Sequence, residues 1–297
     1  MNDSAYWDWH QRGLEAWNAA RLSEAAEAFA RARAEALRRR LPLADRAYCN
    51  WAAIRHVQDR GTGLEKGLSR ILGGSKDPRA RQLAAYHLAC ICCSQKNLKR
   101  ARFYGKMAVR LAESLGVVSG RIASVHLLGL AWLAESRLKE ACACFREALD
   151  LAVGQEEQSH TVMTKSTLGY CLSLQGRQRE GLSLLEEALV DLADLDCRAY
   201  EPSLRLNLGF ALLEGGDLEG AIAQGRAALQ LLEEQGSKGD AKFAYYLLGE
   251  GHAQRGAGRQ AEEYFEILQK RYYPQYPGLA QMLLVCRTSP LLNWLAR

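Results

Sequence analysis

The sequence has little proline and no long apolar run. Only 6 of its 297 residues are proline, so helices can continue without the break that a proline imposes. No stretch of about 18 uncharged apolar residues occurs, and the sequence therefore offers no candidate for a membrane-spanning helix. The first residues, MNDSAYWDWHQRG, lack the basic start and the apolar stretch of a signal peptide. From these absences we expect a cytoplasmic protein with no membrane partner.

The nine cysteines do not follow the pattern of a disulfide framework. Their number is odd, and they lie in apolar segments that read as helices, such as HLACICCSQ and EACACFREAL. In a reducing compartment a buried cysteine acts as a small apolar side chain. A zinc site is the alternative, and it would use His87, Cys90, Cys92 and Cys93. However, Cys92 points to another face of the helix, and no second Cys-x-x-Cys cluster completes a tetrahedral site. We expect no metal and no cofactor.

Signatures of catalysis are also missing. The sequence contains no His-Glu-x-x-His, no Gly-x-Ser-x-Gly and no Walker motif. The segment RGTGLEKGLSRILGGSK is rich in glycine and ends at Lys76. However, its glycines and its lysine do not have the spacing of a phosphate-binding loop. Glu186 and Glu187 are adjacent on a helix, so their carboxylates diverge. We therefore expect no enzyme, with a catalytic residue hidden in a repeat groove as the alternative.

What the sequence does contain is a pattern that returns every 40 residues. Gly129, Gly169, Gly209 and Gly249 are spaced by 40, and each follows a leucine. A second small residue comes twelve positions after each of these glycines. Self-similarity at a fixed period of this size indicates a repeat architecture. The second small residues are Ala141, Gly181, Ala221 and Ala261.

The pattern has a physical explanation in paired helices. A glycine in the first helix and a small residue in the second let the two helix axes approach closely, while bulky side chains fill the seam around the crossing. The segments LQGRQ, EGGDL and RGAGR are the turns between the helices, with glycine closing the preceding helix. One such hairpin cannot bury its apolar face alone, but stacked neighbours can. The sequence therefore predicts an all-α solenoid.

The segments WHQRGLEAW…EAAEAFARA and VHLLGLAW…EACACFREA resemble the tetratricopeptide repeat, whose pattern is Trp-x2-Leu-Gly-x2-Tyr followed by Ala-x3-Phe-x2-Ala. The common repeat has about 34 residues, and the longer unit here is similar to repeats of bacterial peptide-sensing regulators and kinesin-light-chain-type adaptors. The resemblance implies one domain, residues 1–297: a right-handed α-solenoid of about seven helix-turn-helix units and a C-terminal capping helix. We place the units at 5–40, 44–77, 81–116, 121–155, 161–195, 201–236 and 241–274, and the cap at 278–297.

The resemblance also implies where a partner would bind, because in this family the first helix of each unit lines the concave surface. The corresponding positions are rich in apolar and aromatic residues, which suits an amphipathic helix or an extended apolar peptide. Packing between neighbouring units is the alternative use of the same positions. A clamp for a C-terminal carboxylate is disfavoured, because only Asn207 matches its Lys and Asn positions in kind. The candidate groove residues are Trp7, His10, Tyr86, His126, Leu130, Tyr170, Asn207, Phe210, Phe243 and Tyr246.

Positive charge is concentrated near the N-terminus. Residues 31–110 carry 19 Lys and Arg against 5 Asp and Glu, whereas the remainder of the chain is mildly acidic. Three interpretations stay open: a solvated face, a contact with an acidic protein, and a contact with nucleic-acid phosphates. Stacking aromatics are sparse in this region, which weakens a single-strand interpretation. The candidate basic patch consists of Arg38, Arg39, Arg40, Arg79, Arg81, Lys99, Arg100 and Arg102.

The function predicted from these observations is a non-catalytic scaffold or adaptor that binds a polypeptide or amphipathic segment in its concave groove. One alternative is a peptide-responsive regulatory or sensor subunit that acts on a separate effector protein. A second alternative is an accessory factor of a nucleic-acid machine that uses the basic N-terminal third. The partner is expected to be another protein or a peptide, with an acidic protein or nucleic acid as the candidate at the basic region.

Overall fold

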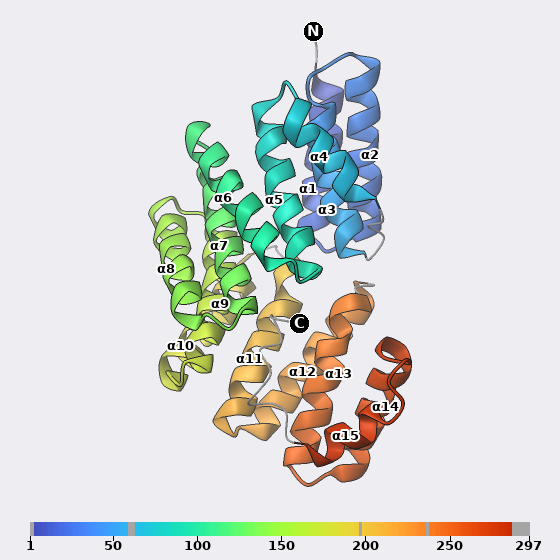
Figure 1. Cartoon of the computed structure of the whole chain (residues 1–297), viewed down its shortest axis with the longest axis vertical. Helices are drawn as coiled ribbons and strands as arrows, with labels where there is room; N and C mark the ends of the chain where they lie inside the picture. Colours follow the sequence, from blue (N-terminus) through green and yellow to red (C-terminus); the bar gives the residue numbers. More distant parts are fainter. Residues whose placement is uncertain (1–2, 59–62, 196–197, 236–237, 287–297) are drawn as a thin grey trace. The chain divides into compact units, whose positions relative to one another are not determined.

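The computed structural model describes residues 3–58, 63–195, 198–235 and 238–286 (Figure 1). Across these residues the chain is built from α-helices and one short 3-10 helix, without a β-strand. Successive helices pair as hairpins, which confirms the predicted all-α fold of tandem helix-turn-helix units. That the chain is a single domain stays a prediction, and so do the residue bounds that we gave to its repeat units. The first eight helices are α1 (Ser4–Asn18), α2 (Leu22–Arg38), α3 (Ala44–Val57), α4 (Leu64–Gly74), α5 (Pro78–Ser94), α6 (Leu98–Ser114), α7 (Val118–Ala134) and α8 (Leu138–Gly154).

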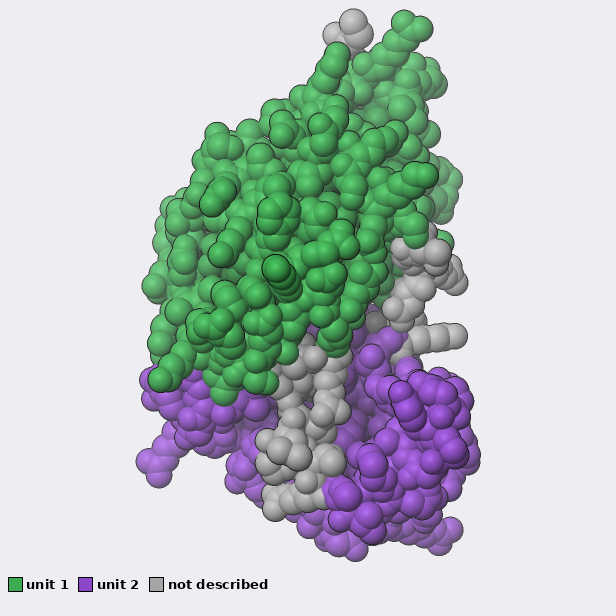
Figure 2. Space-filling model, in the orientation of Figure 1, with its two compact units in different colours: residues 1–164, 195–199, 297 green, residues 165–194, 200–296 purple. Residues whose placement is uncertain are grey.

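The contacts within the chain divide it into two compact units (Figure 2). Unit 1 holds residues 1–164, 195–199 and 297, and unit 2 holds residues 165–194 and 200–296. We call the first helix of each pair an A-helix and the second a B-helix. The remaining helices are α9 (Gln158–Leu174), α10 (Gln178–Ala193), η1 (Arg198–Tyr200), α11 (Glu201–Gly215), α12 (Leu218–Glu234), α13 (Lys238–Gln254), α14 (Gly258–Tyr272) and α15 (Leu279–Val285).

Three of the four recurrent glycines meet their own B-helix most closely, as the sequence predicts, whereas an added Cβ at Gly209 would lie closest to Leu247 on α13, at 2.5 Å. A Cβ atom added at Gly129 would lie 2.5 Å from the ring of Phe145, and one added at Gly249 would lie 2.4 Å from Phe265. At Gly169 the added Cβ would lie 2.7 Å from a backbone atom, the carbonyl oxygen of Gly181. Close helix packing of this kind leaves no room for a side chain.

The turns between the paired helices contain one residue with a positive φ, and this residue recurs at the 40-residue period. In unit 2 it is glycine, at Gly176, Gly216 and Gly256, as predicted for a residue that closes a helix. In unit 1 the same place is taken by Lys96 and Ser136, with φ values of 62° and 58°. The left-handed conformation carries a penalty for a residue with a Cβ atom, so these two turns are strained.

The end of the described chain is a short helix, α15, that contacts α14. The backbone N–H of Ala280 donates a hydrogen bond to Oε1 of Gln269 at 2.9 Å, and Leu283 is buried. Residues 287–297 of the predicted cap lie outside the described residues. In the part of the chain that the structure describes, no helix combines the length and the apolar character needed to cross a bilayer.

Candidate functional site

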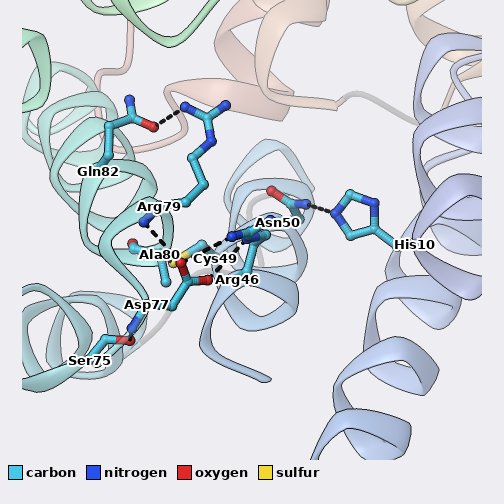
Figure 3. Close-up of polar contacts among 9 residues, drawn as sticks. All are labelled: His10, Arg46, Cys49, Asn50, Ser75, Asp77, Arg79, Ala80 and Gln82. Carbon is cyan, nitrogen blue, oxygen red and sulfur yellow. Dashed lines mark hydrogen bonds and ion pairs between the residues drawn. The ribbon is translucent and has the colours of Figure 1, made fainter. Parts of the chain in front are cut away.

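The A-helices of unit 1 form a face that is linked by polar side chains (Figure 3). We call the surface of α1, α3, α5 and α7 the A-face of unit 1. Helix α3 contacts α5, and α5 contacts α7. Helix α1 joins the row through a hydrogen bond between His10 and Nδ2 of Asn50 on α3, at 3.0 Å. The first two polar side chains of the site therefore come from neighbouring repeat units.

A buried ion pair joins α3 to the start of α5. Arg46 donates from Nε and Nη2 to the two carboxylate oxygens of Asp77, each at 3.0 Å. Asp77 is only 7% exposed, and it also caps α5 by accepting the backbone N–H of Arg79 at 3.0 Å. A charge-assisted, two-pronged pair of this kind is strong and geometrically specific. Because the carboxylate satisfies both a cation and a helix end, this pair fixes the angle between α3 and α5.

An exposed tryptophan lies beside this buried network. The ring centroids of Trp7 and His10 are 5.5 Å apart, and Trp7 is 43% exposed. Burial lowers the pKa of His10, with the charge of Arg46 acting in the same direction. The imidazole is therefore neutral at pH 7 and accepts the hydrogen bond of Asn50. Tyr6 is fully buried next to Trp7, and burial raises the pKa of its hydroxyl to about 12.

Arg79 occupies the centre of the row. Its Nη1 donates to Oε1 of Gln82 at 2.6 Å, and Gln82 is buried. Helix α7 brings Gly120 against this guanidinium, so closely that an added Cβ would lie 2.6 Å from Nη1. Among the described residues no carboxylate lies within ion-pair distance of Arg79. Burial lowers the pKa of Arg79, the charge of Arg46 lowers it further, and Asp77 opposes them.

Farther along α5 the face carries a histidine and two thiols. Nε2 of His87 is buried and has no hydrogen-bond partner among the described residues. Burial lowers the pKa of His87 to about 4, with His56 and Arg79 contributing in the same direction. Burial also raises the thiol pKa of Cys90 to about 12 and that of Cys93 to about 11. Within the described residues no group of three His, Cys, Asp or Glu side chains could hold a metal ion.

The predicted groove residues of unit 1 lie on its A-helices. Trp7 is exposed, His10, Tyr86 and Leu130 are half-buried, and His126 is buried. In the structure the rings of Trp7 and His10 pack against each other. Tyr86 lies on α5 with its ring against His87, at 5.1 Å between centroids. These residues therefore occupy the A-helices that carry the polar row, while a contact with a partner stays a prediction.

The predicted groove residues of unit 2 have different surroundings. Tyr170 is 1% exposed and Phe210 is 3% exposed, and Asn207 is buried as well. Phe210 stacks on Tyr246 with 6.2 Å between ring centroids, and Nδ2 of Asn207 donates to Oγ of Ser166 at 2.8 Å. These side chains contact one another in a packed interior. Their role in binding a partner stays a prediction, as does that of Phe243, which is half-buried.

The predicted basic residues are distributed over several helices. At the end of α2, Arg38 and Arg39 both pair with Glu35. On α6, Arg102 pairs with Glu135 and lies over the ring of Trp132 at 4.4 Å. The remaining members have these places: Arg40 and Lys99 are exposed, Arg81 donates to the carbonyl of Leu72 at 3.2 Å, Arg100 lies over Tyr104 at 5.8 Å, and Arg79 belongs to the A-face. Three of these eight cations pair with carboxylates, and contact with nucleic acid stays a prediction.

Four residues of the site were not identified from the sequence: Arg46, Asn50, Asp77 and Gln82. The pair Asp77–Pro78 is a helix-start signal, because an N-cap aspartate precedes a proline at the first helical position. That signal could have located the start of α5. It could not have revealed the partner of Asp77, because Arg46 lies 31 residues earlier and neither residue is part of the repeat pattern.

No family model and no curated protein matches the sequence. Solved structures do resemble the chain. A Rap protein complexed with competence and sporulation factor has a TM-score of 0.73 at 13% identity, over 95% of this chain and 80% of that one. NprR in complex with its cognate peptide NprX has a TM-score of 0.60 at 15% identity, over 80% and 72% of the two chains.

A third similar structure is a signal transduction ATPase from Pyrococcus horikoshii that has a tetratricopeptide repeat sensor. Its TM-score is 0.60 at 16% identity, over 88% of this chain and 40% of that one. At identities this low the likeness shows the fold alone. The chain therefore has the tetratricopeptide-type repeat fold that its sequence resemblance implies.

Proposed function

We propose that the chain is a non-catalytic interaction protein that binds a polypeptide on the A-face of unit 1. The observation that carries the proposal is the exposed ring of Trp7 beside the half-buried polar row of His10, Asn50 and Arg79. Leu14 is also exposed, and it lies seven residues after Trp7 on the same side of α1. Apolar anchors next to fixed polar groups are what a peptide-binding surface requires.

The ionisable groups of this face support binding rather than catalysis. A thiol whose pKa is raised by burial stays protonated at pH 7 and is a poor nucleophile, which applies to Cys90 and Cys93. A histidine whose pKa is near 4 accepts a proton only weakly at pH 7, which applies to His87.

A peptide-responsive regulatory subunit is the second candidate. It is favoured by the likeness to a Rap protein bound to competence and sporulation factor and to NprR bound to its cognate peptide. In this version a short peptide takes the place of a protein segment on the same face, and the output passes to a separate effector protein. Both candidates require a polypeptide at the A-face, and they differ in the length of that polypeptide.

A photo-crosslinking amino acid placed at two exposed aromatic positions tests the proposal. One variant carries it in place of Trp7, on an A-helix, and the matched control carries it in place of Phe103, which is 60% exposed on the B-helix α6. In extracts of the native cell we expect a discrete polypeptide adduct from position 7 and none from position 103. Equal adducts from both positions, or adducts from position 103 alone, would contradict the proposal.

A further inference from the structure

The A-face of unit 1 carries an ordered arginine, Arg79, for which the described residues supply no ion-pair partner. The charge of Arg46 is neutralised by Asp77 at 3.0 Å. Arg79 on α5 has a neutral partner, the amide of Gln82. His87 follows on the same helix with a buried Nε2 that has no hydrogen-bond partner among the described residues. The Asp77 carboxylate is therefore taken up by Arg46, and Arg79 keeps no ion pair among the described residues.

The guanidinium of Arg79 is held in place but is not closed off. Gln82 and Gly120 fix one edge, because Nη1 bonds to the first and an added Cβ on the second would clash with it. Arg79 as a whole is half-buried, so part of its surface is reached by solvent. An arginine fork that is already ordered loses little entropy when it binds a planar acceptor.

We propose that Arg79 binds the carboxylate of an aspartate or glutamate side chain in the polypeptide that occupies the A-face of unit 1. This inference rests on the proposed function and names the chemistry of the partner at one position. A carboxylate is the group that a guanidinium fork recognises through two parallel hydrogen bonds. Charge complementarity at a half-buried site makes that contact selective as well as attractive.

The position of Arg79 in the row favours a side chain over a chain terminus. Helix α5 has α3 on one side and α7 on the other, so a segment that follows the A-helices passes Arg79 and continues. Trp7 and Leu14 supply exposed apolar surface on α1, at one end of the same row. The expected partner is therefore an amphipathic segment with an acidic residue among apolar ones.

A cleft between α1 and α2 differs from the surroundings of Arg79 in how its charged side chains are paired. It has a volume of about 320 Å³ and is lined by Trp9 and several charged side chains. Four of its charges are paired locally, Arg21 with Glu24 at 2.9 Å and Arg31 with Glu27 at 2.5 Å, and Arg12 lies over the ring of Trp9 at 4.9 Å. Because these groups already have partners, the cleft does not favour a charged ligand in the way that Arg79 does.

A double-mutant cycle between protein and peptide tests the inference. The full chain is used to select binders from a random decapeptide library, and the selected peptides are synthesised. We expect aspartate or glutamate to be enriched at one position. Changing that residue to its amide should weaken binding to the parent protein by about tenfold or more. The same change should have little effect on binding to Arg79→Gln, because the contact is already lost.

Two further variants keep the test decisive. Arg110→Gln removes an exposed arginine from the B-helix α6 and should leave the peptide preference unchanged. Gln82→Glu places a carboxylate beside Arg79 within the protein, and it should weaken acidic peptides without lowering the melting temperature. Melting curves of Arg79→Gln establish that this variant is folded before its affinity is interpreted.

The outcomes separate the inference from the function on which it rests. If selected peptides bind folded Arg79→Gln as tightly as the parent and still distinguish acid from amide, the inference is wrong and the proposed function stands. If blocking the peptide's C-terminus as an amide removes binding instead, the terminus and not a side chain is recognised, and the inference is again wrong. If the library yields no binder at all, the proposed function itself fails.

Discussion

One position of the repeat has different surroundings in the two units. Leu130 on an A-helix of unit 1 keeps part of its surface exposed, whereas Tyr170 and Phe210, at the same repeat position in unit 2, are almost completely buried. The repeat places all of these side chains on A-helices. Their neighbours decide whether they are exposed or buried. In unit 2 the neighbours include the stacked ring of Tyr246 and the buried, hydrogen-bonded pair Asn207 and Ser166. The comparison teaches that a shared repeat position does not imply a shared role.

Removing aromatic rings from the two units should have the most unequal effect. Truncating a buried aromatic side chain to alanine costs about 3–5 kcal/mol because of the cavity that remains. We therefore expect Tyr170→Ala with Phe210→Ala to lower the free energy of unfolding by about 5 kcal/mol or more. Trp7→Ala should lower it by about 1 kcal/mol or less, because that side chain is 43% exposed. Urea unfolding followed by circular dichroism measures both.

The same double variant tests the groove prediction for unit 2. If it remains as stable as the parent and loses its peptide, Tyr170 and Phe210 are binding residues and the packing account of unit 2 is wrong. Loss of binding that accompanies unfolding supports packing.

Overpacking the helix crossings should show a smaller difference between the units. In Gly169→Leu the new side chain meets the backbone carbonyl of Gly181, which cannot rotate away. In Gly129→Leu it meets the ring of Phe145, which can turn. We expect a loss of about 3 kcal/mol or more at Gly169 and about 1–3 kcal/mol at Gly129. Denaturant midpoints in the reverse order would contradict the assignment of a backbone contact to Gly169.

Acid should destabilise α7 more than α11. Burial lowers the pKa of His126 from 6.5 to about 3, with His160 acting in the same direction. The unfolded chain therefore binds the proton more readily, so the stability contributed by neutral His126 is complete above pH 6.5 and is lost as the pH falls toward 3. At pH 5 the loss is about 2 kcal/mol.

Amide hydrogen exchange at pH 7 and pH 5, corrected for intrinsic rates, measures this effect helix by helix. The residue 80 positions after His126 is Leu206 on α11, which does not titrate. His126→Gln should remove most of the pH dependence in α7. Equal protection of α7 at both pH values in the parent would show that His126 is not buried as a neutral ring.

The turns should give the smallest effect, with opposite signs in the two units. Ser136 has a φ of 58°, and its counterpart Gly176 has a φ of 80°. Ser136→Gly removes a strained side chain and should stabilise the protein by about 1 kcal/mol, and Gly176→Ser should destabilise it by a similar amount. Melting temperatures of the two variants should therefore move apart. A shift of both in one direction would contradict the assigned turn geometry.

The fold could be predicted from the sequence because its main determinant is periodic. A helix crossing requires a small residue at a fixed place in the repeat, and Gly129, Gly169 and Gly249 mark that place at multiples of 40 residues. The turn glycines are periodic because each of their repeat units closes its first helix with a residue of positive φ. The strained turns at Lys96 and Ser136 could not be predicted, because the side chain there gives no sign of the backbone conformation.

The candidate site could be predicted only in part. The repeat register placed Trp7 and His10 on an A-helix, where the structure has them. It did not reveal the Arg46–Asp77 pair, because long-range pairs depend on two residue types that occur once and do not repeat. It also did not separate open from packed positions, because register fixes the direction of a side chain and not the neighbours that cover it.

The most direct test of the central claim is an exchange footprint of a selected decapeptide on the full chain. Amide hydrogen exchange, measured with and without saturating peptide, should slow in α1, α3 and α5, the helices that carry Trp7, Asn50 and Arg79. The B-helices α2, α4 and α6 should exchange as they do in the free protein. Slowing confined to the B-helices, with α1, α3 and α5 unchanged, would contradict the claim that the A-face of unit 1 binds the polypeptide.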